Sequence, residues 1–243
     1  MRIRLRYRKL GKVRFTSHRD VARCWERAFR TSGLPIAITE GFSPRPKMHF
    51  GLALSTSHES LGEYLDLDLL DPESAAVDID ALPAMLSGHL PVGIDIEAVA
   101  IIDRSAPSLQ EAVTSCTWHI EVPGLAHADL LPAVERVVSA STLPIVRERK
   151  GKPVSDDLRP GILHLEVLDP TAAPADFAGA VLYAELATAP RSVRPSELMA
   201  VFDPPLLEGR VRRIHQLITE NGATREPLSP GAPPMVFATA SAI

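Results

Sequence analysis

Arginines at alternate positions give the start of the chain the spacing of an anion-binding surface. Successive side chains of a β-strand point to opposite faces, so every second residue shares a face. The residues between the arginines are apolar, which predicts a strand with one buried face and one open, cationic face. Guanidinium groups in this arrangement would bind the phosphates of a partner such as RNA. The set consists of Arg2, Arg4, Arg6 and Arg8.

Two basic loops and a helix extend the predicted surface. Residues 40–47 read EGFSPRPK and residues 147–160 read RERKGKPVSDDLRP, and both combine cations with Gly and Pro. Surface loops carry function more often than packing. Phosphate contacts from such residues position a nucleic acid without reading its sequence. The further candidates are Arg19, Arg45, Lys47, Arg147, Arg149, Lys150 and Arg159.

Charged residues are segregated along the chain. Residues 1–50 hold 13 Lys and Arg against 3 Asp and Glu, whereas residues 51–143 hold 2 against 15. Residues 144–243 are nearly balanced, with 11 against 12, and the formal charge of the whole chain is −4. Such segregation indicates a surface for a polyanion. The alternative is that the acidic segment neutralises the basic one inside the fold.

Catalytic and metal-binding chemistry has weaker candidates. His18 lies at a predicted helix start, where the helix dipole favours the neutral imidazole and thus a general base; a capping or surface role is the alternative. Cys24 and Cys116 are too few for a zinc site or an iron–sulfur cluster. Four acidic residues could hold a cation if they converged, but their spacing also suits a solvated strand face, which we expect. They are Glu59, Glu63, Asp66 and Asp68. We predict no metal and no cofactor.

The composition, 45% hydrophobic and 23% charged, is that of an ordinary globular protein. No apolar run approaches the roughly 20 residues that span a bilayer. The basic N-terminus lacks the apolar core of a secretion signal. We therefore expect a cytoplasmic protein without membrane contact. No nucleotide-binding loop, nucleophile elbow or zinc-protease motif occurs, which favours a non-catalytic protein.

Hydrophobic periodicity predicts strands alternating with helices. After the arginine strand, a helix capped by Thr16 or Ser17 runs to about Thr31 and stops at Gly33. Further strands are predicted over 34–39, 49–54, 64–70 and 93–102, and a second helix over 78–90. The β-α-β-β-α-β order is that of a ferredoxin-like unit, an antiparallel sheet with two helices on one face.

The second half of the chain repeats this order. Residues 142–146 (TLPIV) match residues 33–37 (GLPIA) at an offset of 109, and both lead from a helix into a basic loop. We predict an α+β fold of two tandem ferredoxin-like units that arose by internal duplication. The predicted boundaries are 1–104 for the first unit, 105–114 for a linker, 115–218 for the second unit and 219–243 for a disordered tail.

Several of these segments resemble a known family. They are RFTSHRDVARCWERAFRTSGLPIAITEGFSPRPKMHFGLAL, GEYLDLDL, LPIVRERKGK and DLRP. Together they are similar to the bacterial radical-SAM-linked proteins, a family of unknown function encoded beside, or fused to, radical SAM proteins. The resemblance covers roughly residues 2–217, and its most specific pieces are Ser17-His18 with Asp20 and the run from Glu40 to Pro46. The sequence departs from the family pattern at 55–58.

The resemblance implies a partner and no mechanism. Because the chain lacks cluster cysteines, any radical chemistry would belong to a separate radical SAM protein. Such enzymes often modify tRNA or rRNA, so we expect an accessory protein that binds RNA, the enzyme, or both through the basic surface. Two alternatives stay open: an RNA-processing enzyme with His18 as base, and a scaffold that binds only protein.

Overall fold

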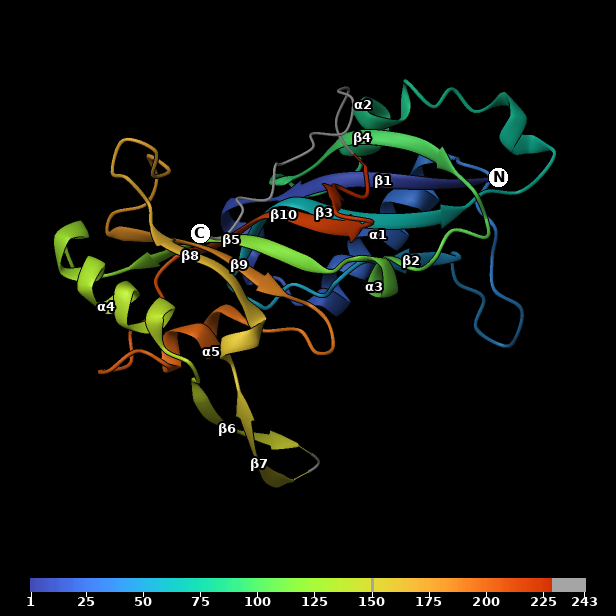
Figure 1. Ribbon diagram of the computed structural model, residues 1–243. Helices are drawn as coiled ribbons and strands as arrows, with labels where there is room; N and C mark the ends of the chain where they lie inside the picture. Colours follow the sequence, from blue (N-terminus) through green and yellow to red (C-terminus); the bar gives the residue numbers. More distant parts are fainter. Residues whose placement is uncertain (150, 229–243) are drawn as a thin grey trace. The chain divides into compact units, whose positions relative to one another are not determined.

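The computed structural model describes residues 1–149 and 151–228 and has an α+β fold (Figure 1). The chain divides into two compact units, Met1–Val113 with Gln216–Ile243, and Thr114–His215. In the described part, nine strands belong to one sheet, and β6 and β7 form a separate two-stranded sheet. Within residues 1–149 and 151–228, no helix is long and apolar enough to cross a membrane.

The first unit contains strands β1 to β4, helices α1 to α3 and the end of β10. The strand order is β4-β1-β3-β10, with β2 beside β3 and β11 beside β10. Strand β1 is antiparallel to both β3 and β4. The elements are β1 (Arg2–Lys9), α1 (His18–Ser32), β2 (Met48–Phe50), β3 (Glu59–Asp68), α2 (Leu82–Ser87), β4 (Ile94–Ile102), α3 (Leu109–Ala112), β10 (Val211–Glu220) and β11 (Ala223–Arg225), with 3-10 turns at Gly11–Phe15 and Glu73–Ala76.

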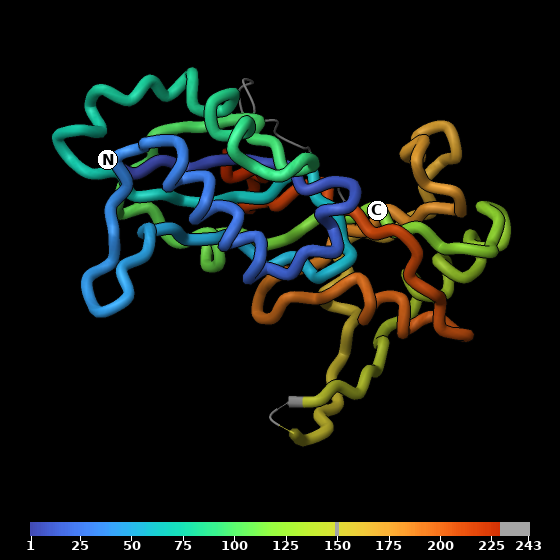
Figure 2. Tube along the Cα trace, turned by 180° about the vertical axis from the view of Figure 1, so that it is seen from behind, coloured from blue at the N-terminus to red at the C-terminus, as the bar shows by residue number. Residues whose placement is uncertain are grey.

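Helix α1 forms where the capping signals predict it. Ser17 is the N-cap, and its hydroxyl oxygen accepts a hydrogen bond from the Asp20 amide at 3.2 Å. Gly33 ends the helix in the left-handed region, with φ of 71°, which a residue without Cβ adopts at little cost. The helix lies along one face of the strands, as Figures 1 and 2 show from opposite sides. Its buried residues are Val21, Trp25, Ala28 and Phe29.

The core of the first unit lies between α1 and the apolar face of β1. Ile3, Leu5 and Tyr7 are buried there, as the strict alternation predicts. The Tyr7 and Trp25 rings meet edge to face with centroids 5.1 Å apart. Leu65 and Leu67 of β3 and Phe29 of α1 belong to the same cluster.

The opposite face of β1 carries a ladder of ion pairs with β3. The register places Arg2 opposite Asp68 and Arg4 opposite Asp66, and directly opposed residues on adjacent strands share a face. Arg4 donates from Nε and Nη2 to the two carboxylate oxygens of Asp66 at 2.7 and 2.9 Å. Arg2 makes the same bidentate contact with Asp68 at 2.7 and 3.1 Å. We call these two pairs the arginine–carboxylate ladder.

The second unit contains strands β5 to β9, helices α4 and α5 and the start of β10. Its strand order is β10-β5-β9-β8, and β5 and β8 are both antiparallel to β9. Helix α4 contacts β8 and β9. The elements are β5 (Ser115–Val122), α4 (His127–Ser139), β6 (Pro144–Arg149), β7 (Lys152–Asp157), β8 (Ile162–Val167), β9 (Ala180–Ala187) and α5 (Pro195–Ala200), with a 3-10 turn at Arg159–Gly161.

Several predicted elements differ in the structure. Residues 34–39 form no strand but only isolated bridges, Ile36 with Leu69 and Ile38 with Pro46; Pro35 has no amide to donate. The helix predicted over 78–90 is confined to α2. The two basic loops, expected to be counterparts, also differ: residues 40–47 are an irregular loop, whereas most of 147–160 belongs to the β6–β7 hairpin.

The predicted linker and tail are partly ordered. Residues 105–114 contain α3, which buries Leu109 and Val113. The tail was predicted from Thr219, but β10 continues to Glu220 and β11 follows. The two strands form a short hairpin in which Ile218 pairs with Arg225. Strand β11 has only three residues, too few for an alternating pattern to be recognised in the sequence. The rest of the predicted tail, 229–243, lies outside the described residues, as does Lys150.

The ladder makes a stability prediction. Arg4→Met leaves the buried carboxylate of Asp66 without its cation, and we expect the free energy of unfolding to fall by about 3–5 kcal/mol in urea titrations. The double variant Arg4→Met/Asp66→Leu removes both charges and should recover most of that loss. An Arg4→Met protein as stable as the wild type would show that the pair is not a structural requirement.

Candidate nucleic-acid interface

The predicted open arginine face is closed, and this corrects the main expectation from the sequence. Arg4 and Arg6 are each only 6% exposed. Arg6 pairs with Glu97 of β4 and, at 3.3 Å, with Glu226. Arg8 is exposed but pairs with Asp95 at 3.0 Å. The acidic segment therefore neutralises the basic strand inside the fold.

Residues near the C-terminal end of the described chain cover this face of the first unit. The hydroxyl of Tyr64, on β3 opposite Arg6, donates to Glu226 at 3.3 Å and to the Leu228 carbonyl at 3.4 Å. Burial, followed by the charge of Glu226, raises the pKa of Tyr64 far above its usual range. A phosphate could reach Arg6 only by displacing these contacts.

The second basic loop is also held by internal contacts. Arg147 donates to Asp156 at 3.0 Å, and Arg191 donates to the same carboxylate at 2.8 Å. These bonds, with that from Arg147 the largest influence, lower the pKa of Asp156. Arg159 donates to the carbonyls of Val138 and Ala140 at 3.1 and 3.2 Å, which are free acceptors at the end of α4. Arg149 contributes backbone pairing to β6.

His18 lies exposed at the first position of α1, without a catalytic partner among the described residues. Its ring meets Phe50 edge to face at 4.9 Å between centroids. The neighbouring Ser17 hydroxyl donates to Asp20 at 2.7 Å, which completes the helix cap. The contacts that the structure gives for His18 are thus those of a residue at a helix start that packs on an aromatic ring.

The acidic residues considered for a cation are used within the fold. Glu59 is buried and accepts from the Gly11 amide at 2.8 Å. Asp66 and Asp68 belong to the ladder, and Glu63 is buried on β3 opposite Tyr7 in the strand register. No group of three or more potential metal ligands is present in the part of the chain that the structure describes.

Cys24 is half-buried on α1, and burial raises the pKa of its thiol. The thiolate is therefore disfavoured, in keeping with a structural role for a small apolar side chain.

A different set of cations remains available in the first unit. Three arginines of α1 and two cations of the 39–47 loop are exposed, and no carboxylate of residues 1–149 or 151–228 pairs with them. Three of these five cations were predicted from the sequence: Arg19 near the start of α1, and Arg45 and Lys47 in the loop. The set is Arg19, Arg27, Arg30, Arg45 and Lys47; we call it the basic set.

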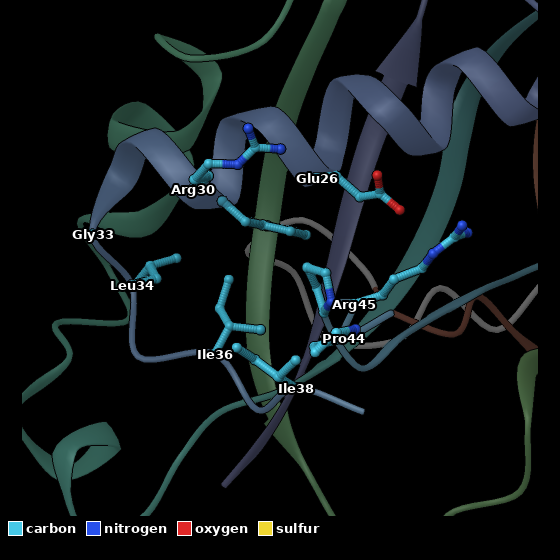
Figure 3. A pocket seen from close by; sticks show the side chains of 10 residues that line it. Glu26, Arg30, Gly33, Leu34, Ile36, Ile38, Pro44 and Arg45 are labelled. Atoms are coloured by element: carbon cyan, nitrogen blue, oxygen red, sulfur yellow. The ribbon is translucent and has the colours of Figure 1, made fainter. Parts of the chain in front are cut away.

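Helix α1 and the loop enclose a pocket of about 380 Å³, the α1 groove (Figure 3). Arg30 and Arg45 line it from opposite sides, together with the carboxylate of Glu26. The remaining lining is mostly apolar: Phe29, Gly33, Leu34, Ile36, Ile38, Pro44 and Pro46. A groove with an apolar floor and two cations at its margin fits a ligand with both a flat apolar part and a phosphate.

Hydrogen bonds between residues of the 37–47 segment close the loop on itself. The Thr39 amide donates to the Arg45 carbonyl at 2.8 Å, and the Arg45 amide donates to the Thr39 hydroxyl at 3.1 Å. The Lys47 amide donates to the Ala37 carbonyl at 2.8 Å. These bonds close the EGFSPRPK segment at its base, and Phe42 is fully exposed at its tip. An exposed aromatic ring next to cations is a feature of surfaces that stack unpaired bases.

Arg30 and Glu26 were not predicted as site residues. Arg19, Arg23, Arg27 and Arg30 recur in the sequence at helical spacing, but such a stripe is usually a solvated face. Arg23 pairs with Asp20 at 2.8 Å, so the stripe is not uniform. The signal that could have found the groove is the position of the stripe directly before the loop.

Taken together, these features define an α+β protein with a cationic, partly apolar groove and no assembled catalytic group among its described residues. A family model described as "Uncharacterized protein conserved in bacteria (DUF2344)" matches residues 2–195. The chain therefore belongs to that bacterial family. Comparison with curated proteins gives no match.

The ladder also makes a prediction about pH. The hydrogen bond from Arg2 lowers the pKa of Asp68, so the folded state binds this proton less readily than the unfolded state, in which an Asp has a pKa of about 3.9. The resulting stability is present above that value and is lost as pH falls through the lower folded pKa. In thermal unfolding from pH 5 to pH 2, Asp68→Asn should show a shallower decline in Tm than the wild type. An identical decline would exclude this contribution.

Proposed function

We propose that this protein is a non-catalytic accessory protein of a radical SAM enzyme and holds RNA in the α1 groove. The observation that carries the RNA part is the contrast between two groups of arginines. Those of β1 are neutralised by carboxylates, whereas the basic set is exposed and without carboxylate partners in residues 1–149 and 151–228. Unpaired surface cations are the groups that release counterions and bind phosphates.

The apolar floor of the groove favours a nucleic acid over a simple polyanion. Phosphates need only cations, but a single-stranded nucleic acid also offers flat bases. Ile36 and Phe29 are buried in the floor, and Arg30 and Arg45 stand at its margin. In this arrangement the arginines would hold the backbone while a base or ribose covers the apolar residues.

The radical SAM part of the proposal is supported by the sequence resemblance alone. The segments around Ser17-His18 and Glu40–Pro46 carry it, and the second of these segments forms one wall of the groove. The two cysteines of the chain are too few for an iron–sulfur cluster, so a partner would supply the radical chemistry.

The duplication also belongs to this proposal. Two strand orders within the nine-stranded sheet support it: β4-β1-β3 with β2 beside β3, and β10-β5-β9-β8. We infer that both units are ferredoxin-like and descend from one ancestral unit, with different side chains on the strands of each unit.

Charge reversal tests the groove. Arg30→Glu/Arg45→Glu should weaken binding of single-stranded RNA about tenfold or more, measured by fluorescence anisotropy. It should also reduce the slope of log affinity against log salt by roughly 1.4, because each lost single-strand phosphate contact removes about 0.7.

The matched control is Arg8→Glu/Arg104→Glu. It changes the net charge equally at two exposed arginines that pair with exposed carboxylates. The control should retain affinity, since such surface pairs contribute little. Equal weakening by both double variants would attribute binding to net charge and contradict a specific groove.

Crosslinking in cells tests the partner. RNA crosslinked to the full chain should be a defined tRNA or rRNA segment. A protein with a three-cysteine radical SAM motif should be recovered in the same preparation. If RNA bridges the two proteins, the Arg30→Glu/Arg45→Glu variant should no longer recover it. Crosslinked material without such a protein would contradict the accessory role.

A further inference from the structure

A row of three aromatic rings crosses the sheet of the second unit. The apolar residues of β5 and β9 alternate with polar ones, and the alternate apolar side chains Trp118, Ile120, Leu182 and Ala184 are buried on one face. His119 lies directly opposite Tyr183 in the strand register, so both belong to the other face.

The rings are in mutual contact across three adjacent strands. The centroids of His119 and Tyr183 are 5.9 Å apart with 63° between the ring planes. The centroids of His164 of β8 and Tyr183 are 5.6 Å apart with 66° between the planes. These are edge-to-face contacts of the kind that stabilise aromatic pairs. We call His119, Tyr183 and His164 the ring row.

Two of the three rings are uncharged at neutral pH. Burial, with smaller effects from the nearby Arg212 and His215, lowers the pKa of His119 to about 4. Burial also raises the pKa of the Tyr183 phenol, which hydrogen-bonds to Thr117. A neutral, ring-lined face does not attract phosphates, but it can stack on a flat ligand.

One carboxylate beside the ring row is open to a ligand. Glu166 of β8 lies opposite Tyr183 on β9, and its side chain is 53% exposed. Its contact is with Nε2 of His164 at 3.6 Å, which is an ion pair only when that imidazole is protonated. The other nearby carboxylate, Glu185, accepts a hydrogen bond from the Ser115 hydroxyl at 2.6 Å.

We propose that the ring row and Glu166 bind an unpaired guanine base of single-stranded RNA. A guanine presents two adjacent donors, N1–H and the N2 amino group, and a carboxylate accepts two parallel hydrogen bonds. Adenine lacks this donor pair, and uracil offers a single N–H donor. Tyr183 and the exposed His164 supply the stacking surface. This inference rests on the proposed RNA function and gives it a base preference.

The face also fits a base better than a phosphate. Glu166 and Glu185 would repel an anionic backbone, and Arg212 already pairs with Asp176 at 2.6 Å. Hydrogen-bond donors without charge are therefore the complementary chemistry. The base-recognising groups of the ring row and the phosphate-binding groups of the α1 groove belong to different units, so each can be altered separately.

Oligonucleotide binding tests the proposal. The wild-type chain should bind the RNA octamer UUGUUGUU about tenfold more tightly than UUAUUAUU in fluorescence anisotropy. Replacing guanine by inosine, which lacks the N2 amino group, should remove most of that preference. Glu166→Gln should remove the preference, whereas Glu135→Gln on the exposed side of α4 should keep it.

Substitutions in the ring row separate stacking from folding. His164→Ala, at an exposed position, should weaken binding of both octamers about fivefold to tenfold, because stacking does not depend on the base. Tyr183→Leu removes the ring and should weaken binding. Tyr183→Phe removes only the hydroxyl that contacts Thr117 and should retain affinity, so the weaker binding of Tyr183→Leu would be due to the lost ring. Unchanged affinity and unchanged base preference in Glu166→Gln and His164→Ala would overturn the proposal.

The results separate guanine binding at the ring row from RNA binding in the α1 groove. If only the ring row is wrong, Arg30→Glu/Arg45→Glu still weakens binding while the ring-row variants do not. If only the groove is wrong, the guanine preference persists and the groove variant binds like the wild type. A wild-type chain that binds neither octamer overturns both.

Discussion

Charge neutralisation between β1 and β3 is the constraint on which the first unit depends. Two arginines and two aspartates occupy opposed positions on adjacent strands, so their bidentate contacts form only in one register. A slip by one residue would place each guanidinium on the apolar side, against Trp25 and Phe29. It would also leave carboxylates buried without a cation, at a cost of several kcal/mol each. The ladder thus specifies the register, and the apolar stripe of α1 supplies the burial that makes a wrong register costly.

That constraint explains why the arginine face predicted to be open is closed. The alternation of Arg2 to Arg8 correctly predicted a strand and its apolar face, because both follow from local periodicity. The residues that cover the polar face cannot be predicted from local periodicity. The partner of Arg4 lies 62 residues further along the chain, and Glu226 lies 220 residues from Arg6. The opposing charges of the two segments were visible in the sequence, but their pairing is a long-range fact that periodicity does not encode.

The local features were predicted more fully. The N-cap at Ser17 and the stop at Gly33 depend on neighbouring residues and were correct. The strand predicted over residues 34–39 was wrong. Their apolar character reflects packing beneath the groove, where Ile36 is buried and pairs with Leu69 in an isolated bridge. The loop at 40–47 was recognised from composition, and Arg45 and Lys47 remain exposed. Arg159, equally basic in the sequence, instead satisfies carbonyls at the end of α4.

The two units solve the same problem with different chemistry. In each unit the central strands have one apolar face and one polar face. In the first unit the polar face is filled with opposite charges, which exclude a ligand by binding each other. In the second unit the face with Tyr183 carries His119 and Tyr183, whose charged forms are disfavoured by burial. His119 and Tyr183 contact each other edge to face across the strands and form no ion pair with each other. The face with Tyr183, proposed above to bind a base, thus differs from the face with Arg4 in the charge of the residues that meet across the strands.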